Sequence, residues 1–238
     1  MGENLLFSIT NWKKPLIIAF TLSPIQYIIL TSIAMFFYAG GTISDPSNQG
    51  FFFWGNFFSD LGRLVAPSGN SNLISFVIFT ISALFLSIML AIFVLLFPKF
   101  FSNKEPSYKF IILGTISGVS ATIFLLLTVL TPWDVFNDIH LVFATLFNIS
   151  GIFVAIFFAI GIRKNKNYPN FYGNIYLLLV LLAIIYVGLT FAAPLFSTSE
   201  KVIIQASYQK ISQYTMMICF VIQGYGVFKL ANNEKLEM

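Results

Sequence analysis

Six apolar stretches, each about 20 residues or longer, constrain this chain more than any other feature of its sequence. They run from about Pro15 to Tyr38, Leu73 to Phe97, Phe110 to Thr131, Asp138 to Ile162, Ile175 to Leu195 and Ile203 to Phe228. An α-helix of that length spans the roughly 30 Å hydrocarbon core of a bilayer and satisfies its own backbone hydrogen bonds there. The sequence therefore predicts an all-α fold, a polytopic membrane bundle of six transmembrane helices that forms a single domain over residues 1–238.

The composition supports the same class of protein. Apolar residues make up 58% of the chain and charged residues 9%, and the mean hydropathy is +0.86. Soluble domains carry about 25% charged residues, so a soluble globular fold is excluded. The formal net charge of +4 comes from loop lysines and does not indicate a nucleic-acid partner. Cys219 is the single cysteine, which excludes an intramolecular disulfide.

The first apolar stretch is too long for the core of a signal peptide, and we expect it to remain as a membrane helix. Pro24 lies well inside this stretch and predicts a kink, because proline leaves a backbone carbonyl of the preceding turn without its partner. We expect the neighbouring hydroxyls of Thr21 and Ser23 to bond the freed carbonyls. The second helix is expected to begin after an N-cap residue, for which three candidates are adjacent in the sequence: Asn70, Ser71 and Asn72.

Lysine and arginine residues alternate between the two ends of the expected helices. Ten of the 13 lie at one end, namely Lys13, Lys14, Lys99, Lys104, Lys109, Arg163, Lys164, Lys166, Lys229 and Lys235. The positive-inside rule places this end in the cytoplasm. We therefore expect a multi-pass protein of the cell membrane with both termini cytoplasmic and with the loop between the first two helices on the outer side.

That outer loop contains the sequence FFFWGNFFSDLGRLVAP, residues 51–67. At 3.6 residues per turn, four polar residues share about a third of the helical circumference: Asn56, Ser59, Asp60 and Arg63. Aromatic and aliphatic residues share the opposite side. The pattern predicts a short amphipathic helix over Phe51–Val65 that lies along the outer interface, with its polar face turned toward the bundle.

Two other segments bring polar residues to the same expected end of the bundle. The turn before the fourth helix supplies Asp134, Asp138 and the only histidine, His140, and the sixth helix begins with Gln209 and Lys210 among other polar residues. A polar cluster at one end of an apolar bundle is typical of a site. We expect the three segments to form one outer-leaflet pocket for the polar headgroup of a membrane lipid or another small ligand.

Each residue type suggests a role in such a pocket. His140, beside Asp60 and Asp134, is suited to general acid–base catalysis, whereas Arg63 and Lys210 are suited to binding a phosphate or carboxylate. The remaining candidates for binding are Asn56, Ser59, Asp138 and Gln209. Structural roles also remain open: the aspartates fit helix capping, Lys210 fits snorkelling to the headgroups, and His140 fits a polar position at the water boundary.

Metal and cofactor signals in the sequence are weak. One histidine, no cysteine outside the expected helices and no HExxH spacing argue against zinc. A calcium or magnesium site built from Asp60, Asp134 and Asp138 would lack a recognisable binding loop. We predict no metal site, and the sequence leaves any other cofactor unknown.

The motif Ser59-Asp60-Leu61-Gly62 resembles the SDLG signature of an uncharacterised prokaryotic membrane family, the domain of unknown function nine-nine-eight. The Asp-His entry to the fourth helix and the pair Gln209-Lys210 at the sixth are similar to that family, which more often has arginine at the latter place. More distantly, the order of elements is similar to the Frag/DRAM/Sfk group of six-helix proteins. That similarity implies a link to membrane-lipid remodelling and lipid signalling, and it implies no particular reaction.

Three functional classes remain open on the sequence. The first is a protein that binds or modifies a lipid headgroup, and whether it is an enzyme is left undecided. The second is a small-solute transporter, which usually places polar groups near the middle of the bilayer. The third is a structural or regulatory subunit whose polar end docks a partner. The polar residues gather at one end, which favours the first class.

Overall fold

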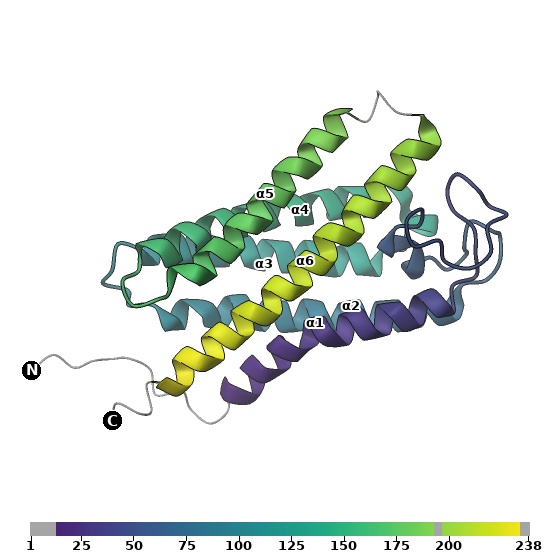
Figure 1. Cartoon of the computed structure of the whole chain (residues 1–238). Coiled ribbons are helices and arrows are strands. Elements are labelled where there is room, and N and C mark those ends of the chain that lie inside the picture. The colour runs from purple at the N-terminus through teal and green to yellow at the C-terminus, as the bar shows by residue number, and fades with distance from the viewer. Residues whose placement is uncertain (1–12, 193–196, 234–238) are drawn as a thin grey trace, which may run out of the picture.

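The computed structural model describes residues 13–192 and 197–233, which form six long α-helices and two short 3-10 helices (Figure 1). In chain order the elements are α1 (Lys13–Phe36), η1 (Phe58–Gly62), α2 (Leu73–Leu96), η2 (Phe97–Phe100), α3 (Tyr108–Leu130), α4 (Trp133–Lys164), α5 (Asn170–Ala192) and α6 (Thr198–Asn233). Each long helix packs against the next one in the sequence, and α6 packs back against α1. The expected helical bundle is confirmed.

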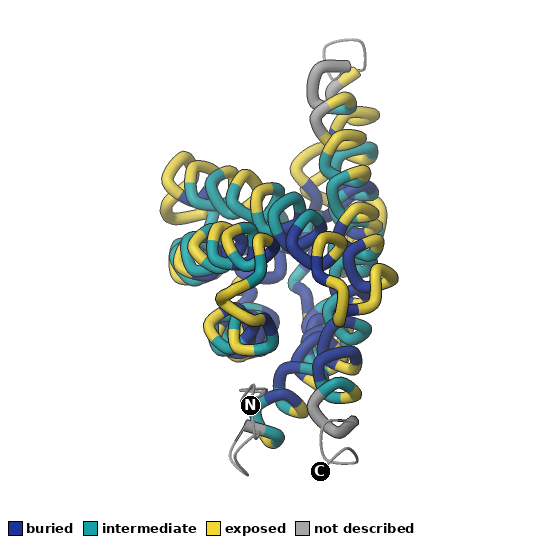
Figure 2. The backbone as a smooth tube through the Cα atoms, turned by 90° about the vertical axis from the view of Figure 1, so that its left-hand side faces the viewer, coloured by how far each residue is buried: buried dark blue, intermediate teal, exposed yellow. Residues whose placement is uncertain are grey.

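Five of these helices, α1, α2, α3, α4 and α6, are long and apolar enough to cross a membrane. In α5 the apolar stretch among the described residues, Asn170–Tyr186, is shorter than a membrane-spanning helix. Many large apolar side chains point away from the bundle, as in Phe36, which is 84% exposed. Exposed residues follow the outward sides of the helices in Figure 2, and buried ones lie where helices face each other. This is the burial pattern of an integral membrane protein.

The most densely packed part of the core lies toward the end of the bundle where α4 is followed by α5. Phe20 of α1 stacks on Phe93 of α2, with ring centroids 3.9 Å apart, and Phe97 contacts Phe158 of α4 at 4.6 Å. Apart from α5 and α6, which cross the others at an angle, the helices run nearly side by side (Figure 1). The ends of α5 and α6 nearest each other in the sequence project beyond the rest of the bundle.

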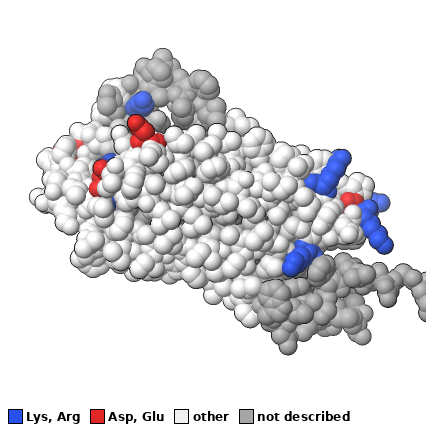
Figure 3. All heavy atoms as spheres, turned by 180° about the vertical axis from the view of Figure 1, so that it is seen from behind, with Lys and Arg blue, Asp and Glu red and all other residues white. Residues whose placement is uncertain are grey.

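Charged side chains gather at the two ends of the face shown in Figure 3, and the surface between them carries none. Among the described basic residues, Lys99, Lys104, Lys109, Arg163, Lys164 and Lys166 lie on the connections at one end of the bundle. We call this the basic end. The opposite end is closed by residues 37–72, which we call the cap. Which end faces the cytoplasm stays a prediction.

Pro24 lies inside α1, and α4 has a kink near its start. The Ser23 hydroxyl donates to the carbonyl of Phe20 at 2.8 Å, which is the carbonyl that Pro24 leaves without a partner, as expected. Thr21 instead donates to the carbonyl of Ile17 at 2.7 Å, which Pro24 does not free. Helix α4 begins about one turn before the expected start at Asp138, but Asn137 has non-helical angles, φ 23° and ψ −95°. The straight part of α4 therefore begins where the sequence placed it.

The expectation of one amphipathic helix over Phe51–Val65 is wrong. The backbone turns at residues 53–55 and then forms only the five-residue 3-10 helix η1. The physical reason is that the polar side chains of this segment bond the cap's own backbone. Asn56 accepts the amide N–H of Phe52 at 2.9 Å and donates to the carbonyl of Gly41 at 2.8 Å. A continuous helix would remove these partners.

Candidate functional site

Asp60 and Asn56 form the buried centre of the cap, and both residues have no exposed surface. One carboxylate oxygen of Asp60, Oδ2, accepts the amide N–H of Phe57 at 2.8 Å and the side-chain N–H of Asn56 at 3.2 Å. The other, Oδ1, pairs with Nε of Arg63 at 2.8 Å. Both oxygens of Asp60 are therefore occupied by groups of the cap itself.

Tyr38 belongs to the same network at the end of α1. Its hydroxyl donates to the carbonyl of Gly41 at 3.3 Å and accepts from Asn56 at 3.3 Å. Burial and the nearby negative charge of Asp60 raise the pKa of the Tyr38 phenol above its ordinary value. Tyr38 is therefore neutral at physiological pH and acts as a hydrogen-bond donor within the cap.

Asn72 fastens the end of the cap to its centre. Its side-chain amide donates to the carbonyls of Asp60, Leu61 and Arg63 at 3.0–3.4 Å and accepts the amide N–H of Ala39 at 3.1 Å. Asn72 does occupy the N-cap position of α2, but its side chain makes no capping hydrogen bond. The side chain of this N-cap residue therefore holds the preceding loop together and does not bond the first N–H groups of α2.

Gln209 and Lys210 connect α6 to the cap. The Gln209 side chain accepts the amide N–H of Phe58 at 2.8 Å. The Lys210 ammonium is 1% exposed and donates to the carbonyls of Asn56 and Ala206. Three phenylalanine rings of the cap surround the ammonium with centroids 5.4–5.7 Å away: Phe51, Phe53 and Phe58. Within the described ranges Lys210 has no ion pair with a carboxylate.

Arg63 is held on two sides at the edge of the cap. Its Nε bonds Asp60, and its guanidinium carbon lies 4.3 Å from the centre of the Trp133 ring. The side chain is 13% exposed. Neither terminal nitrogen, Nη1 or Nη2, has a hydrogen-bond partner in the part of the chain that the structure describes. The guanidinium is thus fixed in place with its outer donors unused.

The first turn of α4 closes over the same edge. Asp134 is exposed, and its carboxylate accepts the amide N–H groups of Leu64 and Val65 at 2.9–3.2 Å. The Trp133 indole donates to Asn137 at 2.7 Å, and this asparagine carries the only positive φ found at a non-glycine residue in 13–192 and 197–233. Such a conformation is strained in an L-residue. This turn is therefore bonded to the cap through Asp134 and set off from the rest of α4 at Asn137.

His140 lies just below that turn and is 8% exposed. Its Nδ1 is 2.7 Å from the carbonyl of Thr131 at the end of α3. A carbonyl can only accept, so Nδ1 carries a proton and Nε2 is the nitrogen that remains for other partners. Asp60 and Arg63 lie within electrostatic range of the ring. His140 is thus near the cap edge and oriented by a backbone group.

The structure joins most of the sequence-predicted residues and leaves two outside the network. Asn56, Asp60, Arg63, Asp134, Gln209 and Lys210 share one continuous set of contacts, and His140 borders it. Ser59 is half-buried and Asp138 is exposed, and no hydrogen bond from either side chain joins them to this set among the described residues. Their binding roles stay predictions.

The family comparison decides between the two resemblances noted in the sequence. The model of the Frag1/DRAM/Sfk1/Cwh43P N-terminal domain matches residues 65–226. The chain belongs to this family. The match begins at Val65, after the Ser59–Gly62 motif, so it confirms the more distant resemblance and does not support the one that rested on that motif. No curated protein and no solved structure matches the chain.

The Frag1-family match covers most of the cap's partners, including two that the sequence reasoning did not select, Asn72 and Trp133. The sequence indicates Asn72 as a candidate helix cap, and it gives Trp133 no role beside Arg63. The sequence does contain a hint of the Trp133 contact. An aromatic residue beside Asp134 at the membrane boundary is suited to stack against a cation such as arginine.

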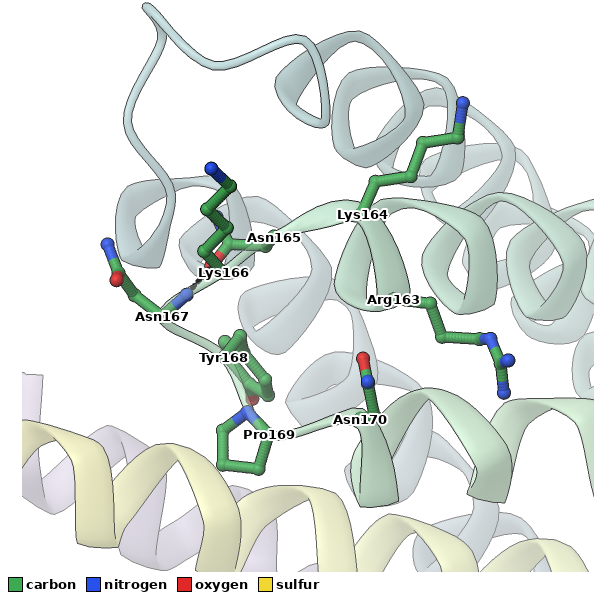
Figure 4. Close-up of a pocket in the computed structure, with 8 residues that line it drawn as sticks. All are labelled: Arg163, Lys164, Asn165, Lys166, Asn167, Tyr168, Pro169 and Asn170. Atoms are coloured by element: carbon green, nitrogen blue, oxygen red, sulfur yellow. Dashed lines mark hydrogen bonds between the residues drawn. The ribbon is translucent and has the colours of Figure 1, made fainter.

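A surface depression at the basic end is the other feature of this Frag1-family chain that we considered as a site. It is lined by residues 163–170, the connection from α4 to α5 (Figure 4). The side chains of Arg163, Lys164 and Lys166 point in different directions in Figure 4 and do not converge on one point. The described residues also contain no group of three or more metal-ligating side chains. The edge of the cap therefore remains the candidate site.

Proposed function

We propose that this integral membrane protein binds the anionic headgroup of a membrane lipid at the edge of the cap. The observation that carries the proposal is the fixed guanidinium of Arg63, whose Nε and ring-facing side are held by Asp60 and Trp133 while both terminal nitrogens stay unbonded. Planar N–H donors arranged in this way match the oxygens of a phosphate or carboxylate. In this proposal Arg63 is the binding group and Asp60 positions it.

The charge balance of the cap supports an anionic ligand. Asp60 contributes one negative charge in the buried network, whereas Arg63 and Lys210 contribute two positive charges, so the sum is one excess positive charge. A charge removed from water is stabilised when an opposite charge is placed near it. The other carboxylates at this edge, Asp45 and Asp134, are exposed to solvent. An anion at Arg63 would therefore balance the buried charges without breaking any hydrogen bond of the cap.

His140 would be the group that exchanges a proton with a bound headgroup. Its Nδ1 proton is committed to the Thr131 carbonyl, which leaves Nε2 to accept a proton from the ligand or to return one. Asp134, Asp138 and Ser59 would border the headgroup from the exposed side. Asp60, with both oxygens occupied, is a positioning group in this proposal and not the base.

A purely structural cap is the second candidate, and one observation favours it. The Asp60 carboxylate, the Asn56 amide and the Asn72 amide are all buried and bonded to other parts of the chain. Such a network could serve only to close the bundle. The two candidates differ at Arg63, because a structural role uses only the Nε contact and the stacking, whereas headgroup binding also requires the terminal nitrogens.

Purified protein in nanodiscs would separate the two candidates. We would measure thermal stability and lipid retention with phosphatidylglycerol, an anionic lipid, and with phosphatidylcholine, a zwitterionic one. The test variant is the double substitution Asp60→Asn with Arg63→Gln, which removes both charges together and leaves no unpaired carboxylate. Arg163→Gln at the basic end is the matched control.

The wild type and the control should be stabilised by the anionic lipid and retain it. The double variant should bind it at least about tenfold more weakly, because a hydrogen bond to a charged group contributes about 1.5–3 kcal/mol. Arg63→Lys keeps the charge but loses the planar donors, and it should give an intermediate value. If the double variant is folded and retains the anionic lipid as the wild type does, the cap is structural.

A further inference from the structure

The middle of α4 presents an amide to the outside of the bundle. Asn148 is separated by 15 positions from Trp133 and by 16 from Lys164, the first and last residues of the helix, and it is exposed. Helix α4 also has the smallest buried share of the five membrane-length helices, 17% of its most apolar window, against 28–44% in the others. An exposed amide at this depth would face hydrocarbon if lipid alone covered it.

The hydrogen-bonding capacity of Asn148 is only partly used. One side-chain N–H donates to the Ala144 carbonyl of the same helix at 2.8 Å. Throughout residues 13–192 and 197–233, its second N–H and its Oδ1 have no partner. Lipid chains offer neither a donor nor an acceptor, so the remaining groups would stay unpaired in the bilayer core. Polar side chains at this depth usually bond another helix.

The exposed position results from the way α5 leaves α4. At 100° per residue, Asn148 shares a face of α4 with Ala155 and Ala159, which are buried near the basic end. There α5 covers that face, since Gly173 approaches the carbonyl of Ala159. Toward the cap α5 diverges from α4 and accompanies α6 (Figure 1). The same face that is covered in one half of α4 is therefore open in the other half.

Contacts to α6 fix α5 in this diverging position. The Tyr208 hydroxyl of α6 donates to the carbonyl of Leu182 on α5, and the Tyr186 and Tyr208 rings stack at 5.2 Å. Near Asn148 the open face of α4 carries a glycine. A side-chain carbon added at Gly151, one turn further along, would meet no atom within 4 Å. A second helix can therefore approach this part of α4 closely.

We propose that this face of α4 is the contact surface of a homodimer, in which Asn148 of one copy bonds Asn148 of the other. An amide carries both a donor and an acceptor, so two copies related by a two-fold axis satisfy each other with N–H···O bonds in both directions. The unused groups of Asn148, one N–H and one oxygen, are the pair that such an arrangement requires. This surface is separate from the cap and does not depend on headgroup binding.

Association in liposomes tests the proposal. Labelled full-length protein is diluted with lipid, and the fraction of paired molecules is followed by single-molecule photobleaching. Asn148→Leu should weaken association at least about threefold, the equivalent of a membrane hydrogen bond of about 0.6 kcal/mol or more. Asn148→Gln keeps the amide and should retain most of the association. Ser117→Leu is the control, because Ser117 is a partly exposed polar residue in mid-helix whose hydroxyl proton is already used by the Leu113 carbonyl of its own helix.

A second measurement locates the contact. With Cys219 replaced by serine, Asn148→Cys should give a disulfide-linked dimer on mild oxidation, and Ser117→Cys should not. The proposal is overturned if the wild type is monomeric at every protein-to-lipid ratio, which would leave lipid or another protein on this face. It is also overturned if Asn148→Leu associates as the wild type does. Lipid retention at the cap should be unchanged in all of these variants.

Discussion

Lys210 is the residue on which the charge balance of the cap depends. Its ammonium is buried against two carbonyls and three phenylalanine rings, with no ion pair in the described part of the chain. Desolvation of such a cation costs free energy that two neutral acceptors recover only in part. In the proposed function, an anion at the edge of the cap would offset part of this cost.

We therefore expect Lys210→Met to separate stability from binding. Methionine fills the same space among the rings, and the lost carbonyl bonds are offset by the lost desolvation cost, so the unfolding free energy should change by less than about 1 kcal/mol. Retention of phosphatidylglycerol in nanodiscs should fall severalfold, because the buried groups, Asp60, Arg63 and Lys210, lose their excess positive charge. Lys201→Met, an exposed position on the same helix, is the control. Unchanged lipid retention in Lys210→Met would contradict the charge argument.

Asn72 carries the second prediction at the scale of one residue. Its amide faces the carbonyls of Asp60, Leu61 and Arg63. Asn72→Asp keeps the shape but turns a donor into a charged acceptor against those carbonyls, so it should lower the unfolding free energy by more than about 3 kcal/mol. Asn70→Asp, two residues away and exposed, should change it by less than about 0.5 kcal/mol. Thermal unfolding in detergent would measure both.

The cap is the element that the sequence explains least well. The 3.6-residue spacing of Asn56, Asp60 and Arg63 predicted a helix, and two of these residues are indeed turned inward and buried. The helix does not form because their partners are distant in the sequence: the carbonyl of Gly41, the amide of Asn72 and Lys210 of α6. A local pattern contains no information about such partners. The spacing indicated which side chains turn inward, but it did not predict the backbone conformation that holds them.

Glycines at positive φ are what allow the cap to turn back on itself, and they give the third prediction. Gly41 has φ +83°, and a side-chain carbon there would lie 2.4 Å from the backbone nitrogen of Ser68. Gly50 has φ +65° with nothing within 4 Å. Gly50→Ala should therefore cost only the backbone strain, about 1–2 kcal/mol, whereas Gly41→Ala should cost clearly more because the backbone must also move. If both variants lowered the unfolding temperature equally, the backbone around Gly41 would move at little cost and this prediction would be wrong.

At the scale of the whole molecule, the prediction from sequence was accurate where a single physical effect dominates. Long apolar runs form helices in lipid whatever their neighbours, so helices such as α2 and α3 begin and end within two residues of the expected positions. The angle between α5 and α4, which exposes Asn148, depends on contacts such as Tyr208 to Leu182. Such contacts form between segments far apart in the chain, so no periodic pattern in the sequence predicts them.

The orientation in the membrane is the last prediction, and it follows from the charges at the two ends. The connections at the basic end carry most of the described lysines and arginines, whereas the cap end carries Arg63, Lys201 and Lys210. The positive-inside rule counts residues in short loops beside the helices, which is where they lie. The basic end should therefore face the cytoplasm, and the cap should face outward.

Single cysteines in a Cys219→Ser background test this orientation. Ser47 in the cap, Asn103 before α3 and Asn167 between α4 and α5 are all exposed. An impermeant thiol reagent applied to intact cells should label Ser47→Cys alone, and permeabilised cells should show labelling at all three. Labelling of Asn103→Cys or Asn167→Cys in intact cells would reverse the orientation. The proposed headgroup site would then face the inner leaflet, where anionic lipids are common.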